Sequence, residues 1–149
     1  MKLEIRAIGK MRGALADLGA EYHKRIGKNL TIREYEAPKG FSGAALQAKE
    51  AAFLLDALPP SLPVIVLDEC GKDEGSAAFA KQFGRWREAG GAIFLLGGAD
   101  GHAPAVRDRA DFLLALGHKT WPHLLARVML IEQIYRAQQI LAGHPYHRS

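Results

Sequence analysis

The chain has 149 residues and a formal net charge of +4, and 48% of its residues are hydrophobic while 24% are charged. This size and composition predict one folded domain over residues 1–149, and the single cysteine, Cys70, excludes a disulfide framework or a zinc site of several cysteines. The longest apolar run, residues 92–98, is too short to cross a bilayer, and charged side chains interrupt the N-terminal apolar positions, so we expect a soluble cytoplasmic protein.

The first half of the chain alternates strand and helix patterns. Residues 2–8 alternate apolar and charged side chains, which predicts a half-buried strand. Residues 14–26 carry an apolar stripe at helical spacing, and residues 29–36 predict a second strand. After a loop that contains proline and glycine, residues 44–58 are rich in strong helix formers, and the proline pair that follows is expected to stop this helix.

The second half continues the alternation with more deeply buried strands. The short apolar runs at residues 64–67, 92–96 and 112–116 are typical of strands that are covered on both faces of a parallel sheet. Between these runs we expect one helix capped by Ser76 and a short helix over residues 104–109. Strands that alternate with helices predict an α/β fold with a mostly parallel sheet and helices on both faces.

The last predicted helix, residues 124–141, carries two rows of apolar side chains. The rows are Leu124, Val128, Ile131 and Tyr135, and Leu130, Ile134, Ala137 and Leu141. One face of a sheet covers only one such row, so the second row predicts a contact with a second chain. A thickly packed single chain is the alternative.

Three predicted strands end in loops of unusual composition, at residues 67–72, 97–101 and 116–123. Ligands of open α/β sheets bind beyond the carboxyl ends of the strands, so these loops can converge on one small-molecule pocket. The glycines of the second loop let backbone approach a ligand closely, although ordinary turns use the same residues.

Several common fingerprints are absent. The chain has no G-x-G-x-x-G after its first strand, no P-loop and no G-x-S-x-G, which leaves dinucleotide, P-loop and hydrolase sites unsupported. His144 and His147 lie three residues apart without a neighbouring carboxylate or thiol to complete a metal site. Asp68 and Glu69 disfavour a thiolate at Cys70, so we assign this cysteine no nucleophilic role.

Basic residues concentrate at both ends of the chain. Residues 1–30 hold seven basic and three acidic residues, residues 31–115 hold nine and twelve, and residues 116–149 hold four and one. A face that binds a polyanion gives this pattern, and so does an ordinary solvated surface. The tail, residues 144–149, places two histidines, a tyrosine and an arginine around one proline, a composition that favours a functional segment.

Six short motifs occur along the chain: Met1-Lys-Leu3, Leu67-Asp68 with Gly71-Lys72, Leu96-Gly97-Gly98-x-x-Gly101, Pro122-His123 with Arg127-Val128, Tyr135-Arg136, and His144-Pro-Tyr-His-Arg148. In this order and at this length, they resemble the family of small SPOUT-class ribosomal RNA methyltransferases H. The resemblance covers essentially the whole chain, and the C-terminal motif is its most specific part.

This resemblance implies one SPOUT methyltransferase domain with a C-terminal trefoil knot. It also implies N3-methylation of a pseudouridine in 23S rRNA, in the ribosome or its large subunit, with S-adenosylmethionine as methyl donor and no metal. SPOUT enzymes generally pair, which implies a homodimer. The cofactor, bent between the knot loops, is then expected to contact Leu67, Gly97, Gly98, Gly117, His118, Lys119, Thr120, Trp121 and Pro122.

The tail supplies the catalytic candidates. The N3 proton of a pseudouridine lies between two carbonyls, so its removal needs a base or a stabilised carbonyl oxygen. His147 can act as this base, Arg148 can hold a phosphate or a carbonyl oxygen, and Tyr146 can stack on the target base. Two alternatives stay open: a non-catalytic ribosome-binding protein, and a SPOUT methyltransferase that acts on another RNA.

Overall fold

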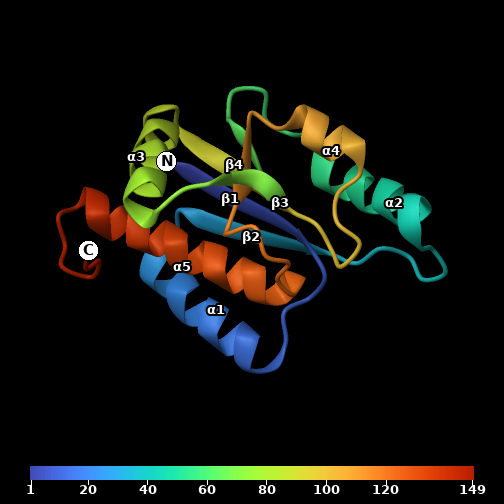
Figure 1. Ribbon diagram of the computed structural model, residues 1–149, viewed down its shortest axis with the longest axis horizontal. Helices are drawn as coiled ribbons and strands as arrows, with labels where there is room; N and C mark the ends of the chain where they lie inside the picture. Colours follow the sequence, from blue (N-terminus) through green and yellow to red (C-terminus); the bar gives the residue numbers. More distant parts are fainter.

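Five parallel strands form the central sheet of the protein, which a computed structural model describes over all residues 1–149 (Figure 1). The strands lie in the order β2-β1-β4-β3-β5. Their bounds are Lys2–Ile8 for β1, Leu30–Tyr35 for β2, Val64–Asp73 for β3, Gly91–Leu96 for β4 and Phe112–Ala115 for β5. Because every neighbouring pair is parallel, all carboxyl ends of the strands meet at one edge of the sheet.

Helices cover both faces of this sheet (Figure 1). The helices are α1 (Gly13–Ile26), α2 (Gly43–Leu55), α3 (Ser76–Glu88), α4 (Pro104–Arg109) and α5 (His123–Leu141). One hydrophobic core joins α1, α3 and α5 to one face, and a second joins α2 and α4 to the other. The predicted α/β fold, parallel sheet and two helical layers are therefore confirmed. None of the helices is both long and apolar enough to span a membrane.

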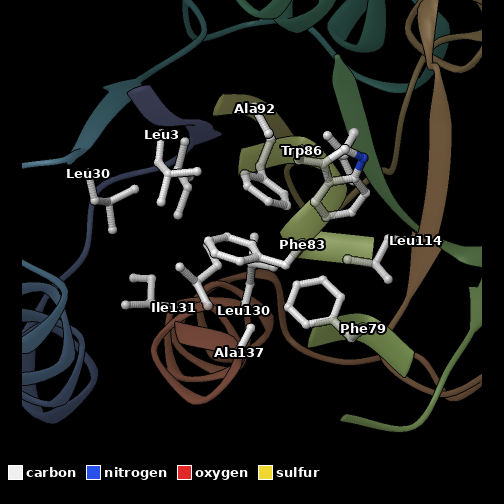
Figure 2. Close-up of a cluster of buried hydrophobic side chains, with 14 of the residues drawn as sticks. Leu3, Leu30, Phe79, Phe83, Trp86, Ala92, Leu114, Leu130, Ile131 and Ala137 are labelled. Atoms are coloured by element: carbon white, nitrogen blue, oxygen red, sulfur yellow. The ribbon is translucent and has the colours of Figure 1, made fainter. Parts of the chain in front are cut away.

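The larger core is built around the aromatic side chains of α3 (Figure 2). Phe79, Phe83 and Trp86 recur at helical spacing and all lie buried beneath the helix. The Trp86 ring packs edge-on against Phe94 of β4 and Phe112 of β5, with both centroids 5.7 Å away. These edge-on contacts hold α3 across β4 and β5, the two strands that lead into the predicted loops at residues 97–101 and 116–123.

The burial of α5 corrects the argument that one of its apolar rows needs a second chain. Val128 and Ile131 of one row, and Leu130 and Ile134 of the other, are all buried within this chain. Helix α1 packs along one side of α5 and α3 along the other, so neighbouring helices cover both rows. The alternative, a thickly packed single chain, accounts for this pattern.

Three local predictions were wrong at the ends of elements. Helix α2 ends at Leu55, before the proline pair that was expected to stop it. Gly75 is the N-cap of α3, and the hydroxyl of Ser76 donates instead to Gln133 of α5 at 2.9 Å. Strand β3 continues to Asp73 rather than ending with the apolar run, because it rejoins β5 after a break in register.

This break in register brings backbone unusually close to backbone. Between Leu67 and Lys72 the pairing of β3 with β5 shifts, and Gly71 lies directly against β5. A Cβ atom at Gly71 would lie 2.7 Å from the carbonyl carbon of Leu113 and 2.8 Å from that of Leu114. Only a residue without a side chain fits here.

We therefore expect Gly71→Ala to lower the free energy of unfolding by about 1–3 kcal/mol, the usual cost of overpacking. The matched control is Gly75→Ala, because a Cβ at Gly75 meets nothing within 4 Å and the backbone φ of −65° suits any residue. Urea unfolding of both variants tests this expectation. Equal stabilities of the two variants would contradict the close approach at Gly71.

Candidate functional site

A cavity of about 640 Å³ lies beyond the carboxyl ends of β4, β3 and β5, which are neighbours in the sheet. Its wall comes from residues 67–69, 96–102, 116–117 and 119–123, with Arg107 of α4 and Ala126 of α5. The three loops singled out in the sequence thus converge on one space. Its volume is in the range of small-molecule sites.

Most of the predicted cofactor-binding residues lie in this wall. Those that line the cavity are Leu67, Gly97, Gly98, Gly117, Lys119, Thr120, Trp121 and Pro122. His118 does not line it. The indole of Trp121 is 39% exposed and donates its N–H to the carbonyl of Leu116 at 2.7 Å, which folds the third loop back on itself.

Side chains of the third loop fasten it to the end of β3. The Thr120 hydroxyl donates to the Glu69 carboxylate at 2.7 Å, and the His118 ring donates from Nδ1 to the Glu69 carbonyl at 3.0 Å. The Gly117 amide donates to the Asp73 carboxylate at 3.2 Å. His118 therefore acts on the shape of the loop, and Glu69 holds two of its residues at once.

The second loop is crowded around its first two glycines. A Cβ at Gly97 would lie 3.1 Å from the His102 ring. A Cβ at Gly98 would lie 2.8 Å from the Glu50 carboxylate and 3.2 Å from the Ile8 side chain, and neither of these residues lines the cavity. At both positions the neighbouring atoms leave little room for a side chain, which explains the two glycines.

Glu50 of α2 supports this loop from beneath. It is buried, its Oε1 has no hydrogen-bond partner, and burial together with the nearby charge of Asp100 raises the pKa of its carboxyl. One turn earlier, Gln47 donates to the Asp100 carbonyl at 2.7 Å. Helix α2 thus contacts the glycine loop through two side chains and holds it in position.

His102 joins the first loop to the second. Its Nε2 lies 3.0 Å from the Leu67 carbonyl, and since a carbonyl only accepts, this nitrogen carries the proton. Burial lowers the pKa of His102, so the ring is neutral at neutral pH. Its Nδ1 is buried without a partner, beside Gly97.

Asp68 and Arg107 form an ion pair in the cavity wall. The Asp68 carboxylate accepts the Cys70 amide at 2.9 Å and the Arg107 Nε at 2.6 Å. Burial acts to raise the pKa of Asp68, but these two donors outweigh it and hold that pKa below its usual value. Sequence reasoning missed Arg107, because a residue on a short helix between two strands gives no periodic or spacing signal.

The N-terminus of α5 closes the cavity and is held by Arg127. This buried guanidinium donates to the carbonyls of Ile8 and Gly9, both at 2.9 Å, and to the Glu34 carboxylate at 2.6 Å. His123 packs over Gly9, where a Cβ would lie 3.0 Å from its Nε2. Burial lowers the pKa of His123, and the charge of Arg127 adds to this effect.

Comparison with known proteins agrees with this geometry. The family model described as "Predicted SPOUT methyltransferase" matches residues 1–147. The chain belongs to the SPOUT methyltransferase family. It is 53% identical, over the full length of both chains, to "Ribosomal RNA large subunit methyltransferase H" of Rhodospirillum centenum. It is 47% identical to the protein of the same name in Paramagnetospirillum magneticum, over 99% of each chain.

A solved structure shows the same fold. The SpoU methyltransferase AviRb from Streptomyces viridochromogenes superposes with a TM-score of 0.52 at 11% identity. The match covers 96% of this chain and 61% of that one. This likeness confirms a SPOUT-type α/β fold, and the family model and the two relatives confirm the resemblance found in the sequence.

Within a single chain of this protein, the tail (residues 144–149) does not line the cavity. The Tyr146 hydroxyl donates to Glu132 at 2.9 Å, and His147 Nδ1 lies 3.2 Å from an Nη of Arg136. These partners lie roughly two turns or more along α5 from the cavity wall. Tyr146, His147 and Arg148 are all absent from that wall. No three His, Cys, Asp or Glu side chains, in the tail or elsewhere, are grouped closely enough to hold a metal ion.

The neutral, buried His102 predicts a pH dependence of stability. Because its folded-state pKa lies below the unfolded value, its contribution is present above about pH 6.5 and is lost as the pH falls toward the folded-state pKa. His102→Gln keeps a donor for the Leu67 carbonyl and removes the titration. Urea unfolding at pH 8 and pH 5 should therefore show a smaller loss of stability in this variant than in the wild type. Equal losses would contradict a buried neutral ring.

Proposed function

We propose that this protein transfers a methyl group from S-adenosylmethionine to N3 of a pseudouridine in the 23S rRNA of the large ribosomal subunit. One observation carries the proposal: three strand-end loops enclose a single cavity in a chain of the SPOUT methyltransferase family. The rRNA substrate is supported by full-length similarity to proteins named ribosomal RNA large subunit methyltransferase H.

The cavity suits S-adenosylmethionine in size and in lining. Its volume of about 640 Å³ is within the usual range for such ligands. Leu67, Leu96 and Leu116 give apolar walls for an adenine ring, and the glycines at 97 and 98 leave backbone N–H and C=O groups uncovered by side chains. The bound cofactor would supply an activated methyl group. The loops would hold it in one orientation, with His118 acting through Glu69.

Methyl transfer then requires the chain to hold the acceptor in line with this methyl group and to remove its N3 proton. We assign proton removal to His147, base stacking to Tyr146 and the binding of a phosphate or carbonyl oxygen to Arg148. Tyr146 and His147 contact Glu132 and Arg136 in the middle of α5. None of the three lines the cavity of its own chain, so we propose that they serve the cavity of a second subunit.

The surface for this second subunit is an apolar groove along α5, bounded by α1 on one side and by β5 and the start of α3 on the other. Leu18, Tyr22, Leu125 and Met129 line it, and Leu18 is 43% exposed. A stable dimer is expected to bury more than about 1,000 Å² in total. Light scattering at micromolar concentration should therefore give twice the chain mass of 16.3 kDa, and a particle of the single-chain mass would contradict the dimer.

The decisive experiment for the function is mass mapping of 23S rRNA from a strain that lacks the gene. One pseudouridine should lose its methyl group, and the purified protein with S-adenosylmethionine should restore it. An unchanged 23S rRNA would favour a methyltransferase for another RNA. Calorimetry that detects no S-adenosylmethionine binding would favour a non-catalytic ribosome-binding protein.

Gly98→Val is expected to abolish cofactor binding in a protein that stays folded. The added side chain would strike Glu50 and Ile8, so it would push the loop into the cavity rather than fill the cavity itself. If this crowding is the cause, Glu50→Ala should restore part of the affinity lost in Gly98→Ala. Calorimetry with S-adenosylmethionine measures the affinity of Gly98→Val, of Gly98→Ala and of the double variant that also carries Glu50→Ala. Wild-type affinity in folded Gly98→Val would refute the placement of the cofactor.

Removal of residues 144–149 should leave cofactor affinity nearly unchanged and abolish methyl transfer, since the tail lies outside the cavity wall. Arg148→Ala alone should slow transfer by about tenfold or more, the loss expected for a charge-assisted hydrogen bond. Methylation of ribosomes by the truncated protein at the wild-type rate would show that the tail has no catalytic role.

Mixing two inactive variants tests whether the tail acts across the dimer. Tail-truncated subunits keep an intact cavity, and Gly98→Val subunits keep an intact tail. Mixed dimers therefore contain one complete site if the tail serves the partner's cavity, and activity should return after the subunits exchange. Continued inactivity in mixtures proven to contain mixed dimers would contradict this arrangement.

A further inference from the structure

Arg107 is a side chain of the cavity wall that neither the cofactor loops nor the tail accounts for. It is the one residue of α4 in that wall, and its side chain is 49% exposed. About half of this side chain is therefore accessible to a ligand.

The position of Arg107 is fixed through one nitrogen only. Its Nε binds the Asp68 carboxylate at 2.6 Å, and the Asp68 side chain is just 3% exposed. The second oxygen of Asp68 accepts the Cys70 amide at 2.9 Å, so this carboxylate is held at both ends. The two terminal nitrogens of Arg107 have no hydrogen-bond partner in the chain, which leaves their N–H groups available.

Stability alone gives little reason for this arrangement. A half-exposed ion pair contributes little to folding, whereas the burial of Asp68 has a desolvation cost. What the pair does achieve is orientation, because a guanidinium held at Nε offers its terminal N–H groups as planar donors. Carboxylates and phosphates are the ligands that accept from such donors in parallel pairs.

We propose that Arg107, oriented by Asp68, forms an oxyanion subsite at the mouth of the cavity. The inference rests on the proposed function, which brings two such oxyanions to this place: the carboxylate of S-adenosylmethionine and a phosphate of the RNA. Because Asp68 offsets the charge of Arg107, recognition here comes from the direction of the donors more than from net charge.

The first arm of the test concerns the carboxylate. Calorimetry compares S-adenosylmethionine with decarboxylated S-adenosylmethionine on the wild type and on Arg107→Gln. If Arg107 binds the carboxylate, either change alone weakens binding by about tenfold, and the second change adds no further loss. Arg107→Lys keeps the charge but loses the planar fork, and it should not restore the affinity.

The second arm concerns the phosphate. Binding to ribosomes from a strain that lacks the gene is measured between 50 and 200 mM KCl at constant magnesium. If Arg107 binds a phosphate, Arg107→Gln lowers the salt slope by about one while the affinity for S-adenosylmethionine stays at the wild-type value.

Arg109→Gln is the matched control for both arms. Arg109 lies on the same helix, pairs with Asp111 at 3.3 Å and does not line the cavity. A change confined to Arg107→Gln supports the subsite, and the arm that changes identifies the oxyanion. Wild-type behaviour of Arg107→Gln in both arms, or equal losses in Arg109→Gln, would overturn it. A wild type that binds neither S-adenosylmethionine nor ribosomes would instead refute the proposed function.

Discussion

The buried guanidinium of Arg127 is the interaction on which the geometry of the site depends. It is 1% exposed and joins α5 to the ends of β1 and β2, through the carbonyls of Ile8 and Gly9 and the carboxylate of Glu34. Only the guanidinium is buried, since the Glu34 side chain is 33% exposed, and the loss of its partners would leave this buried charge without compensation. Since the first turn of α5 closes the cavity, this ion pair also fixes the position of the cavity wall.

A second constraint is the close approach of backbone to its surroundings in the first and second loops. At Gly71 the first loop lies against the backbone of β5, and at Gly98 the second loop lies on Glu50 and Ile8. In both places a side chain would have to displace atoms that cannot move freely. The positions of these two loops are therefore determined by the sheet and by α2.

Local pattern was sufficient to predict most elements and the meeting of the three loops, because the carboxyl ends of parallel strands share one edge. Local pattern failed where contacts between residues far apart in the sequence determine the extent or the burial of an element. Strand β3 extends past residue 67 because β5 pairs with it again, and the two rows of α5 are buried because α1 and α3 flank it. Arg107 enters the cavity wall through Asp68, 39 residues earlier. The knot has no periodic signature, so only the family resemblance predicted it.

The hydrogen bonds of the tail within one chain restrict the chemistry that Tyr146 and His147 can perform. The Tyr146 hydroxyl donates to Glu132, and burial raises its pKa, so this phenol stays a donor. Arg136 donates to Nδ1 of His147, which places the proton of a neutral ring on Nε2. In this arrangement neither group has a free lone pair positioned to take a proton. The proposed base role for His147 therefore requires that its contact with Arg136 breaks, and in the proposed dimer the docking of the tail on the second subunit would replace this contact.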